Sequence, residues 1–309
     1  MIKRILVGFD GSPQAKDALA VGSRLADGLG VRAILGASFS DEWLSDRDGP
    51  LDTALERESA TLRANAAAEL APSATEAIEV RVISRESAAD GLCDLAAAER
   101  ADLIVIGSTH RGGVGRILPG SLALQMIGAT PCPLAIAPRG LAPEADPARG
   151  PVIVAFDGTE LAERAVAFAA TVAAQAGTWL RLIGVAATPA QAEAALLGGV
   201  APLGGILDKE GLQASIDAQL EKLPRALDAQ GTVLEGSPVQ ALASSAFGPG
   251  GLVVAGSHGR GPLMSLLLGS VSDEIVKRVS WPVVLVPPQV TLEALEGSAS
   301  SETPVTGAA

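Results

Sequence analysis

Tyrosine is absent from this sequence, and aromatic residues make up only 3% of its 309 residues. Proteins that bind single-stranded nucleic acid stack the bases on aromatic side chains, so this scarcity argues against such a surface. Basic residues are also in the minority: 23 Lys and Arg stand against 35 Asp and Glu, giving a net charge of −12. A chain this acidic is repelled by the phosphates of DNA, RNA and anionic membranes. We therefore predict no nucleic-acid partner.

The chain has only two cysteines, Cys93 and Cys132, and their spacing is not that of a metal site. We interpret both as packing residues. Charge-free stretches at 117–138 and 236–257 are long enough to span a bilayer, but proline and glycine interrupt both. The apolar part of the N-terminal segment is too short for a signal peptide. These features predict a soluble, cytoplasmic protein with no membrane partner.

The sequence repeats itself. ILVGFDGSPQAKDAL, from Ile5, resembles VIVAFDGTELAERAV, from Val152, and TPCPLAIAP resembles SWPVVLVPP later in each half. Each half alternates apolar strands with helices, and strands rich in Val, Ile and Leu are typical of a parallel sheet covered on both faces. The pattern predicts an α/β protein with two repeated doubly wound parallel five-stranded sheets of the Rossmann-like type, in domains 1–140 and 151–288. Residues 141–150 form the linker, and we expect a disordered tail at 289–309.

The sequence of the first half predicts where its strands and helices lie. Strands are expected near Arg4–Phe9, Arg32–Ser38, Glu79–Ser84, Leu103–Gly107 and Leu134–Ala137. Helices are expected near Pro13–Leu29, Leu51–Leu70, Ser87–Arg100 and Ser121–Ile127. The second half is expected to repeat this order, with a glycine-rich insertion at 198–207 after its second strand.

Each half contains a glycine-rich loop between an apolar strand and a helix. The loops read GSTHRGGVGRILPGS from Gly107 and GSHGRGPLMSLLLGS from Gly256, 149 residues apart. The end of a parallel strand followed by a helix N-terminus is where backbone N–H groups bind anions. Gly256 and Gly259 are expected to allow a sharp turn and a close approach to phosphate, because glycine has no Cβ. The pair of loops therefore predicts a duplicated nucleotide site.

Asp10 and Asp157, 147 residues apart, end the first strand of each half. Ligands of open α/β sheets bind in the crevice outside the carboxyl ends of the strands, which places both carboxylates beside the predicted sites. An alternative is structural, since Asp before Gly-Ser or Gly-Thr stabilises a turn and helps to begin the next helix. Both roles can hold at once.

Together these residues resemble the universal stress protein family in its tandem, two-domain form, over about residues 1–288. The ATP-binding members of that family share the spacing Gly-x2-Gly-x9-Gly-Ser/Thr. The second half matches it in full, at Gly256, Gly259, Gly269 and Ser270. The first half matches at Gly107, Gly120 and Ser121, but His110 replaces the second glycine. The resemblance implies an adenine nucleotide alpha hydrolase-like fold.

The resemblance also implies ATP as the ligand. Asp10 or Asp157 could hold Mg²⁺ between its phosphates. The two histidines of the chain, His110 and His258, both fall in these loops, where ligand contact and a solvated role stay open. The predicted nucleotide-binding residues are Gly8, Asp10, Gly107, Ser108, His110, Arg111, Gly112, Gly113, Gly120, Ser121, Asp157, Val185, Gly256, Ser257, His258, Gly259, Arg260, Gly261, Gly269, Ser270 and Val271. The second half departs from the first at Ala155, which adds a methyl group where the first half has Gly8.

The segment SLALQMIGA, from Ser121, has no charged residue, so we expect burial against the other half or another subunit. In the family the last strands pair across a dimer-like interface, which implies that PLAIAP and PVVLVP pair here within one chain. A homodimer is also open.

No Walker loop and no catalytic constellation of Ser, His, Cys and Asp is recognisable in the sequence. We therefore predict an ATP-binding stress-response protein whose conformation or assembly depends on the nucleotide, with at most slow ATP hydrolysis. Two alternatives stay open: a nucleotide-free interaction scaffold and a weak ATP hydrolase. AMP and cyclic nucleotides are also open as ligands, because the loops recognise phosphate more clearly than base.

Overall fold

The computed structural model describes residues 1–45, 50–70, 79–109, 120–140, 146–186, 209–235, 250–257 and 281–290. The first half contains β1 (Arg4–Gly8), α1 (Pro13–Leu29), β2 (Arg32–Phe39), α2 (Asp41–Ser45), α3 (Leu51–Glu69), β3 (Glu79–Ser84), α5 (Ala88–Ala98), β4 (Leu103–Gly107), α6 (Ser121–Ile127) and β5 (Leu134–Ala137). The second half contains β6 (Val152–Phe156), α7 (Glu160–Ala176), β7 (Leu180–Ala186), α9 (Lys209–Lys222), β8 (Ala229–Glu235), β9 (Leu252–Gly256) and β10 (Val283–Val286).

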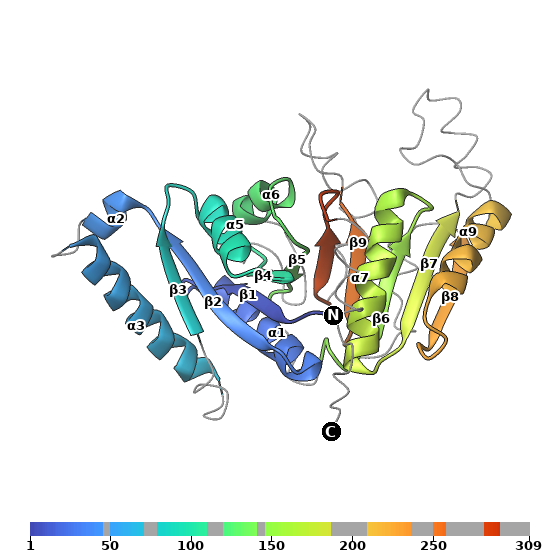
Figure 1. The fold of residues 1–309 in the computed structure, drawn as a ribbon, viewed down its shortest axis with the longest axis horizontal. Helices are drawn as coiled ribbons and strands as arrows, with labels where there is room; N and C mark the ends of the chain where they lie inside the picture. Colours follow the sequence, from blue (N-terminus) through green and yellow to red (C-terminus); the bar gives the residue numbers. More distant parts are fainter. Residues whose placement is uncertain are drawn as a thin grey trace, which may run out of the picture.

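All of these strands join one ten-stranded sheet in the order β3-β2-β1-β4-β5-β10-β9-β6-β7-β8 (Figure 1). Within each half the neighbouring strands are parallel, and the order is that of a doubly wound sheet. The two five-stranded units meet at an antiparallel pair, in which Val283 of β10 lies opposite Ile136 of β5. The expected fold class and the expected pairing of the two last strands are confirmed, with the difference that the two sheets form one continuous sheet.

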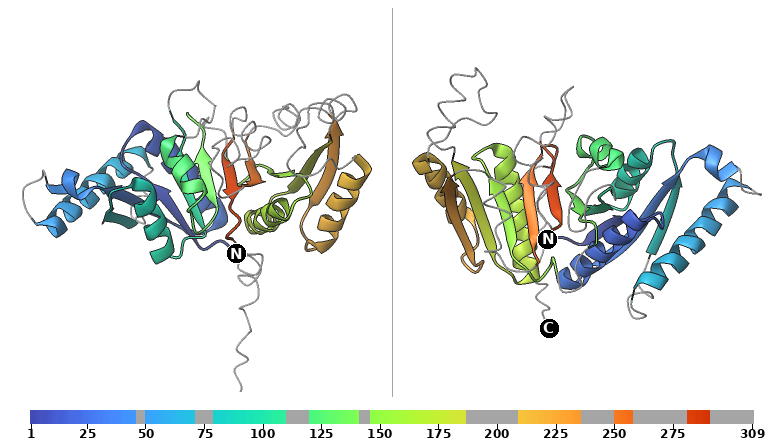
Figure 2. Two further views of the ribbon diagram at one scale, coloured as in Figure 1. Left: turned by 90° about the horizontal axis from the view of Figure 1, so that it is seen from above. Right: turned by 180° about the vertical axis from the view of Figure 1, so that it is seen from behind.

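Helices cover the two faces of this sheet. The core cluster on one face combines side chains of α1, α3, α7 and α9 with alternate strand residues such as Ile5 and Val7. The cluster on the other face combines α5 and α6 with the intervening residues, such as Leu6. Both clusters contain residues from both halves, so the core runs through the junction. Figure 2 shows β10 at that junction, between the blue-to-green first half and the yellow-to-orange second half.

Side-chain caps and glycines mark the two ends of α1 and α7. Ser12 and Thr159 accept hydrogen bonds from the N–H groups of Ala15 and Ala162 and so cap the N-termini of α1 and α7. Both helices end at a glycine in the left-handed conformation. The expected bounds of the first-half elements agree with the structure to within two residues; the short helix α2 was not predicted.

The apolar segment SLALQMIGA forms α6, and only part of it is buried. Ala123, Met126 and Ile127 are buried, whereas Ser121 and Gln125 are exposed. Helix α6 packs on α5 and β5 of its own half. Burial within the half therefore accounts for much of its apolar character, and the interface proposed for it stays a prediction. The insertion at 198–207 and most of the tail, 291–309, lie outside the described residues.

Candidate functional site

The two aspartates that end the first strand of each half form the same turn. Asp10 Oδ1 accepts the N–H of Ser12 at 2.9 Å, and Asp157 Oδ1 accepts the N–H of Thr159 at 3.0 Å. The intervening glycine in each turn has a φ near +80°, a conformation that favours glycine. The structural interpretation of these aspartates is thus confirmed in both halves. Both aspartates are exposed residues, so their carboxylates are accessible from solvent.

Gly107 and Gly256 are the last residues of β4 and β9, and each lies against the first turn of a helix. A Cβ at Gly107 would lie 2.0 Å from the carbonyl oxygen of Gln14 in α1. A Cβ at Gly256 would lie 2.8 Å from the carbonyl group of Leu161 in α7. Glycine is therefore required at these positions because a helix N-terminus packs directly on the strand end. Neither glycine has a positive φ, so the sharp turn expected at Gly256 does not occur at that residue.

The serines that follow these glycines are buried: Ser108 is 0% exposed and Ser257 is 1% exposed. Their N–H groups bond to Ala137 O at 3.0 Å and Val286 O at 2.9 Å, which extends the pairing with β5 and β10. These two N–H groups are therefore used within the sheet. Ser108 Oγ has no hydrogen-bond partner in the part of the chain that the structure describes. A buried hydroxyl without a partner is unfavourable, so Ser108 is the polar group of this site that most needs an acceptor or donor.

Helix α6 starts close to the end of β4. A Cβ at Gly120 would lie 3.6 Å from the methyl group of Thr109, so both ends of the intervening loop meet at one place. Gly120 occupies the N-cap position and supplies no side-chain hydrogen bond to the helix. Gly120 therefore gives the first N–H groups of α6 no side-chain cap, and exposed Ser121 stands beside them.

Gly8, Ala155 and Val185 lie on the strands beneath this edge. A Cβ at Gly8 would lie 3.1 Å from Leu92 Cδ1 of α5, so the glycine makes room for that helix. At the corresponding place in β6, Ala155 is partly buried in the same core cluster, and Val185 of β7 packs there too. Their observed contacts are with the core.

The remaining predicted residues are His110, Arg111, Gly112, Gly113, His258, Gly259, Arg260, Gly261, Gly269, Ser270 and Val271, and they lie outside the described residues. Three further residues lie beside the predicted ones and were not included in the sequence prediction. Ser12 and Thr159 cap the helices that follow the two aspartates, and Thr109 contacts Gly120. The first two carry a recognisable signal, a hydroxyl residue directly before a helix. Thr109 has no such signal, because its contact with Gly120 depends on the folded loop.

Burial of the two thiols fits their interpretation as packing residues. Cys132 is buried, and burial raises its pKa to about 12. Cys93 is only half-buried, and burial raises its pKa to about 11. Among the described residues no group of three or more His, Cys, Asp or Glu side chains is placed to hold a metal ion. Nor does any helix in the described ranges combine the length and apolar character needed to cross a bilayer.

Comparisons with known proteins agree on one family. The profile of the Universal stress protein family matches residues 1–138 and again 149–287. A universal stress protein of Mycobacterium tuberculosis H37Rv is 31% identical over 196 residues, which covers 61% of this chain and 62% of the relative. One from Thermus aquaticus is 32% identical over 152 residues, covering 43% of this chain and 97% of the relative. The chain thus spans less than two thirds of the length of the mycobacterial relative.

Solved structures support the same fold. A universal stress protein from Archaeoglobus fulgidus matches with a TM-score of 0.59 at 19% identity, over 92% of this chain and 96% of that one. A functionally unknown protein from Pseudomonas aeruginosa PAO1 matches with a TM-score of 0.55 at 16% identity, over 97% and 98%. Since the family profile matches nearly the whole chain in two successive copies, this chain belongs to the universal stress protein family, in a tandem form with two domains.

Proposed function

We propose that each half binds an adenine nucleotide, ATP in the first instance, at the carboxyl ends of its strands, and that the bound nucleotide sets the conformation or assembly of a cytoplasmic stress-response protein. One observation carries the proposal. The exposed carboxylate of Asp10 stands at the end of β1, and Gly107 ends the neighbouring strand β4. The chain leaves these two strands toward opposite sides of the sheet, and ligands of open α/β sheets bind at such a switch point.

The second half supports the proposal by repeating the arrangement. Asp157 ends β6, Gly256 ends the adjacent β9, and both make the same backbone contacts as their first-half counterparts. A phosphate in the first half would lie beside Ser121 at the start of α6, where Gly120 supplies no side-chain cap and a negative charge is favoured. Ser108, whose buried hydroxyl has no partner among the described residues, directly follows Gly107.

The residues fit Mg²⁺ only as part of a nucleotide complex. In each half the aspartate that follows the first strand, Asp10 or Asp157, already accepts a backbone N–H with one of its carboxylate oxygens. Mg²⁺ prefers six oxygen ligands and keeps several waters, so the phosphates and water would supply the remainder. The protein alone would bind the ion weakly.

Substitution by asparagine tests the role of the aspartates without disrupting their turns. Asp10→Asn and Asp157→Asn keep an Oδ1 acceptor for the turn and remove the charge. Calorimetric titrations with ATP, AMP and cyclic AMP, each with and without Mg²⁺, give the ligand and the ion dependence. We expect the double variant to lose affinity for Mg-ATP at least about tenfold while its thermal stability stays near that of the wild type.

Two outcomes would favour the alternatives. Absence of binding by the wild-type protein at millimolar nucleotide would contradict the proposal and leave an interaction scaffold. Steady-state phosphate release that disappears in Asp157→Asn would indicate a hydrolase. Mass spectrometry of small molecules that co-purify with the protein identifies the natural ligand independently of both assays.

A further inference from the structure

Equivalent positions at the junction of the two halves carry glycine in the first half and glutamine in the second. Gly28 is the last residue but one of α1, and Gln175 is the last residue but one of α7. Both helices end at a left-handed glycine, Gly30 and Gly177, so the two positions correspond in structure as well as in order. Helices α1 and α7 pack against each other across the junction.

Gln175 bonds to the backbone of the first half. Its Nε2 donates to the carbonyl oxygens of Ile2 at 2.8 Å and Leu29 at 2.9 Å, and its Oε1 accepts the N–H of Ile2 at 2.9 Å. Ile2 is only 3% exposed and leads directly into β1. Figures 1 and 2 show the N-terminus between the two halves in every view. One amide side chain therefore satisfies three backbone groups of the other half.

Gly28 faces the second half, but with no space for a side chain. A Cβ at Gly28 would lie 2.2 Å from the Cβ of Ala148, which is 1% exposed. Ala148 belongs to the segment that leads into β6, and Thr178 Oγ1 holds that segment by donating to Gly150 O at 2.9 Å. Any residue other than glycine at position 28 would force this segment away.

A second pair of positions shows the same asymmetry. Gln289, the third residue after β10, donates from Nε2 to Thr130 O of the first half at 2.7 Å. Gly140, the third residue after β5, has a φ of +64° and gives its N–H to Asp17 of its own half at 3.0 Å. At both pairs of positions a glutamine side chain of the second half donates hydrogen bonds to the first half. The corresponding residue of the first half is a glycine, which has no side chain to do so.

We propose that these paired positions make the two halves specific partners for each other. A first half pairs with a second half, whereas two first halves or two second halves do not pair. In a pair of second halves, each Gln175 would face an Ala148 that leaves no space for its Cβ. In a pair of first halves, each buried Ile2 would face Gly28 and lose its amide partner. Pairing of β5 with β10 uses backbone groups, which do not discriminate between sequences.

The test starts from the complete folded chain. A site for a sequence-specific protease is placed at 141–145, and the folded protein is cut there. Light and isotope-labelled samples of the cut protein are mixed, and urea is raised until they have exchanged fragments and then removed. Native mass spectrometry then counts the pairs. We expect only pairs of a first half with a second half, in mixed-label combinations; pairs of like halves in random proportion would overturn the proposal.

Two substitutions of Gln175 separate the effect of its hydrogen bonds to the first half from the effect of its Cβ on pairing between two second halves. Gln175→Ala removes the three hydrogen bonds but keeps a Cβ, so it should weaken the natural pair at least about tenfold without creating pairs of second halves. Gln175→Gly also removes the clash, so pairs of second halves should then appear. Gly128→Ala is the control, since no atom lies within 4 Å of the added Cβ. A Gln175→Gly protein that pairs as the wild type does would refute the proposal.

Discussion

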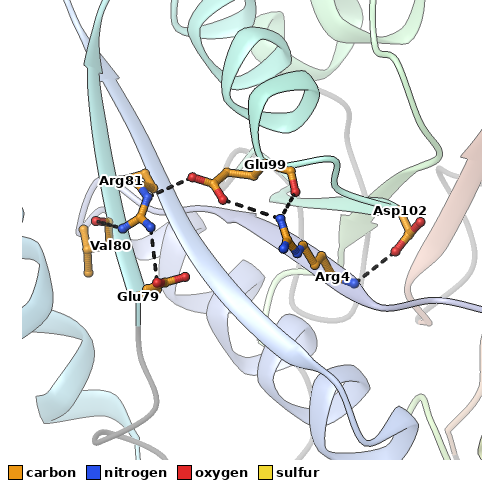
Figure 3. Close-up of polar contacts among 6 residues, drawn as sticks. All are labelled: Arg4, Glu79, Val80, Arg81, Glu99 and Asp102. Atoms are coloured by element: carbon orange, nitrogen blue, oxygen red, sulfur yellow. Dashed lines mark hydrogen bonds and ion pairs between the residues drawn. The ribbon is translucent and has the colours of Figure 1, made fainter.

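Arg81 Nε lies 2.8 Å from the Glu99 carboxylate and thereby ties β3 to the residue that follows α5 (Figure 3). Glu99 also accepts from Arg4 at the start of β1: its carbonyl oxygen is 2.6 Å from Arg4 Nη1. Arg81 contacts Glu79 as well, at 3.2 Å. The hydrogen bond to Glu99 raises the pKa of Arg81, so the guanidinium stays charged. The network joins β1, β3 and α5 at one end of the first half.

Glu99→Gln is expected to lower the free energy of unfolding by about 1 kcal/mol, because the pair is partly exposed and water screens it. Its backbone bond to Arg4 is unaffected by the change. Urea unfolding at low and high salt measures the effect, which should shrink as salt rises. Glu56→Gln, at an exposed position of α3, is the control and should be nearly neutral. Equal losses in the two variants would show that the network adds nothing.

Gly107→Ala is expected to destabilise the protein by about 3 kcal/mol, because the new methyl group collides with the backbone of Gln14. Gly256→Ala should cost less, since its nearest contact is longer, at 2.8 Å rather than 2.0 Å. Chemical denaturation of the two variants provides the comparison. The reverse ranking would contradict the packing described for these glycines.

Asp10→Ala and Asp10→Asn should differ in stability. Alanine removes the acceptor for the Ser12 N–H and is expected to cost about 1 kcal/mol, whereas asparagine retains an acceptor and should be nearly neutral. Thermal unfolding distinguishes the two. If both variants lose the same stability, the carboxylate charge rather than the turn bond supports the start of α1.

The two thiols predict a loss of stability at alkaline pH. Folding raises the pKa of Cys132 from 9.0 to about 12 and that of Cys93 to about 11, so the unfolded chain releases these protons first. The contribution is complete below pH 9 and is lost as pH rises toward the folded values. Urea unfolding at pH 8, 9 and 10 should show the decline. A Cys132→Ala variant should show a smaller decline, and an unchanged slope would contradict the assignment.

The sequence predicted the elements of the first half closely, because strand and helix signals are local. Ser12 before Pro13, and the left-handed Gly30 after Leu29, mark the ends of α1 without reference to the rest of the chain. The candidate site was predicted only in part. Gly107 was predicted to bind the nucleotide, yet its observed requirement comes from Gln14, more than 90 residues earlier, which no local pattern reveals.

The repeat, the alternation of strands and helices and the Asp-Gly turns followed from the sequence alone, since each depends on residues a few positions apart. Tertiary structure decided how the halves differ. Gln175 and Gln289 of the second half bond to the first half, whereas Gly28 and Gly140 stand at the corresponding positions of the first half. Such contacts join segments brought together only by packing, so similar sequences in the two halves acquire different partners.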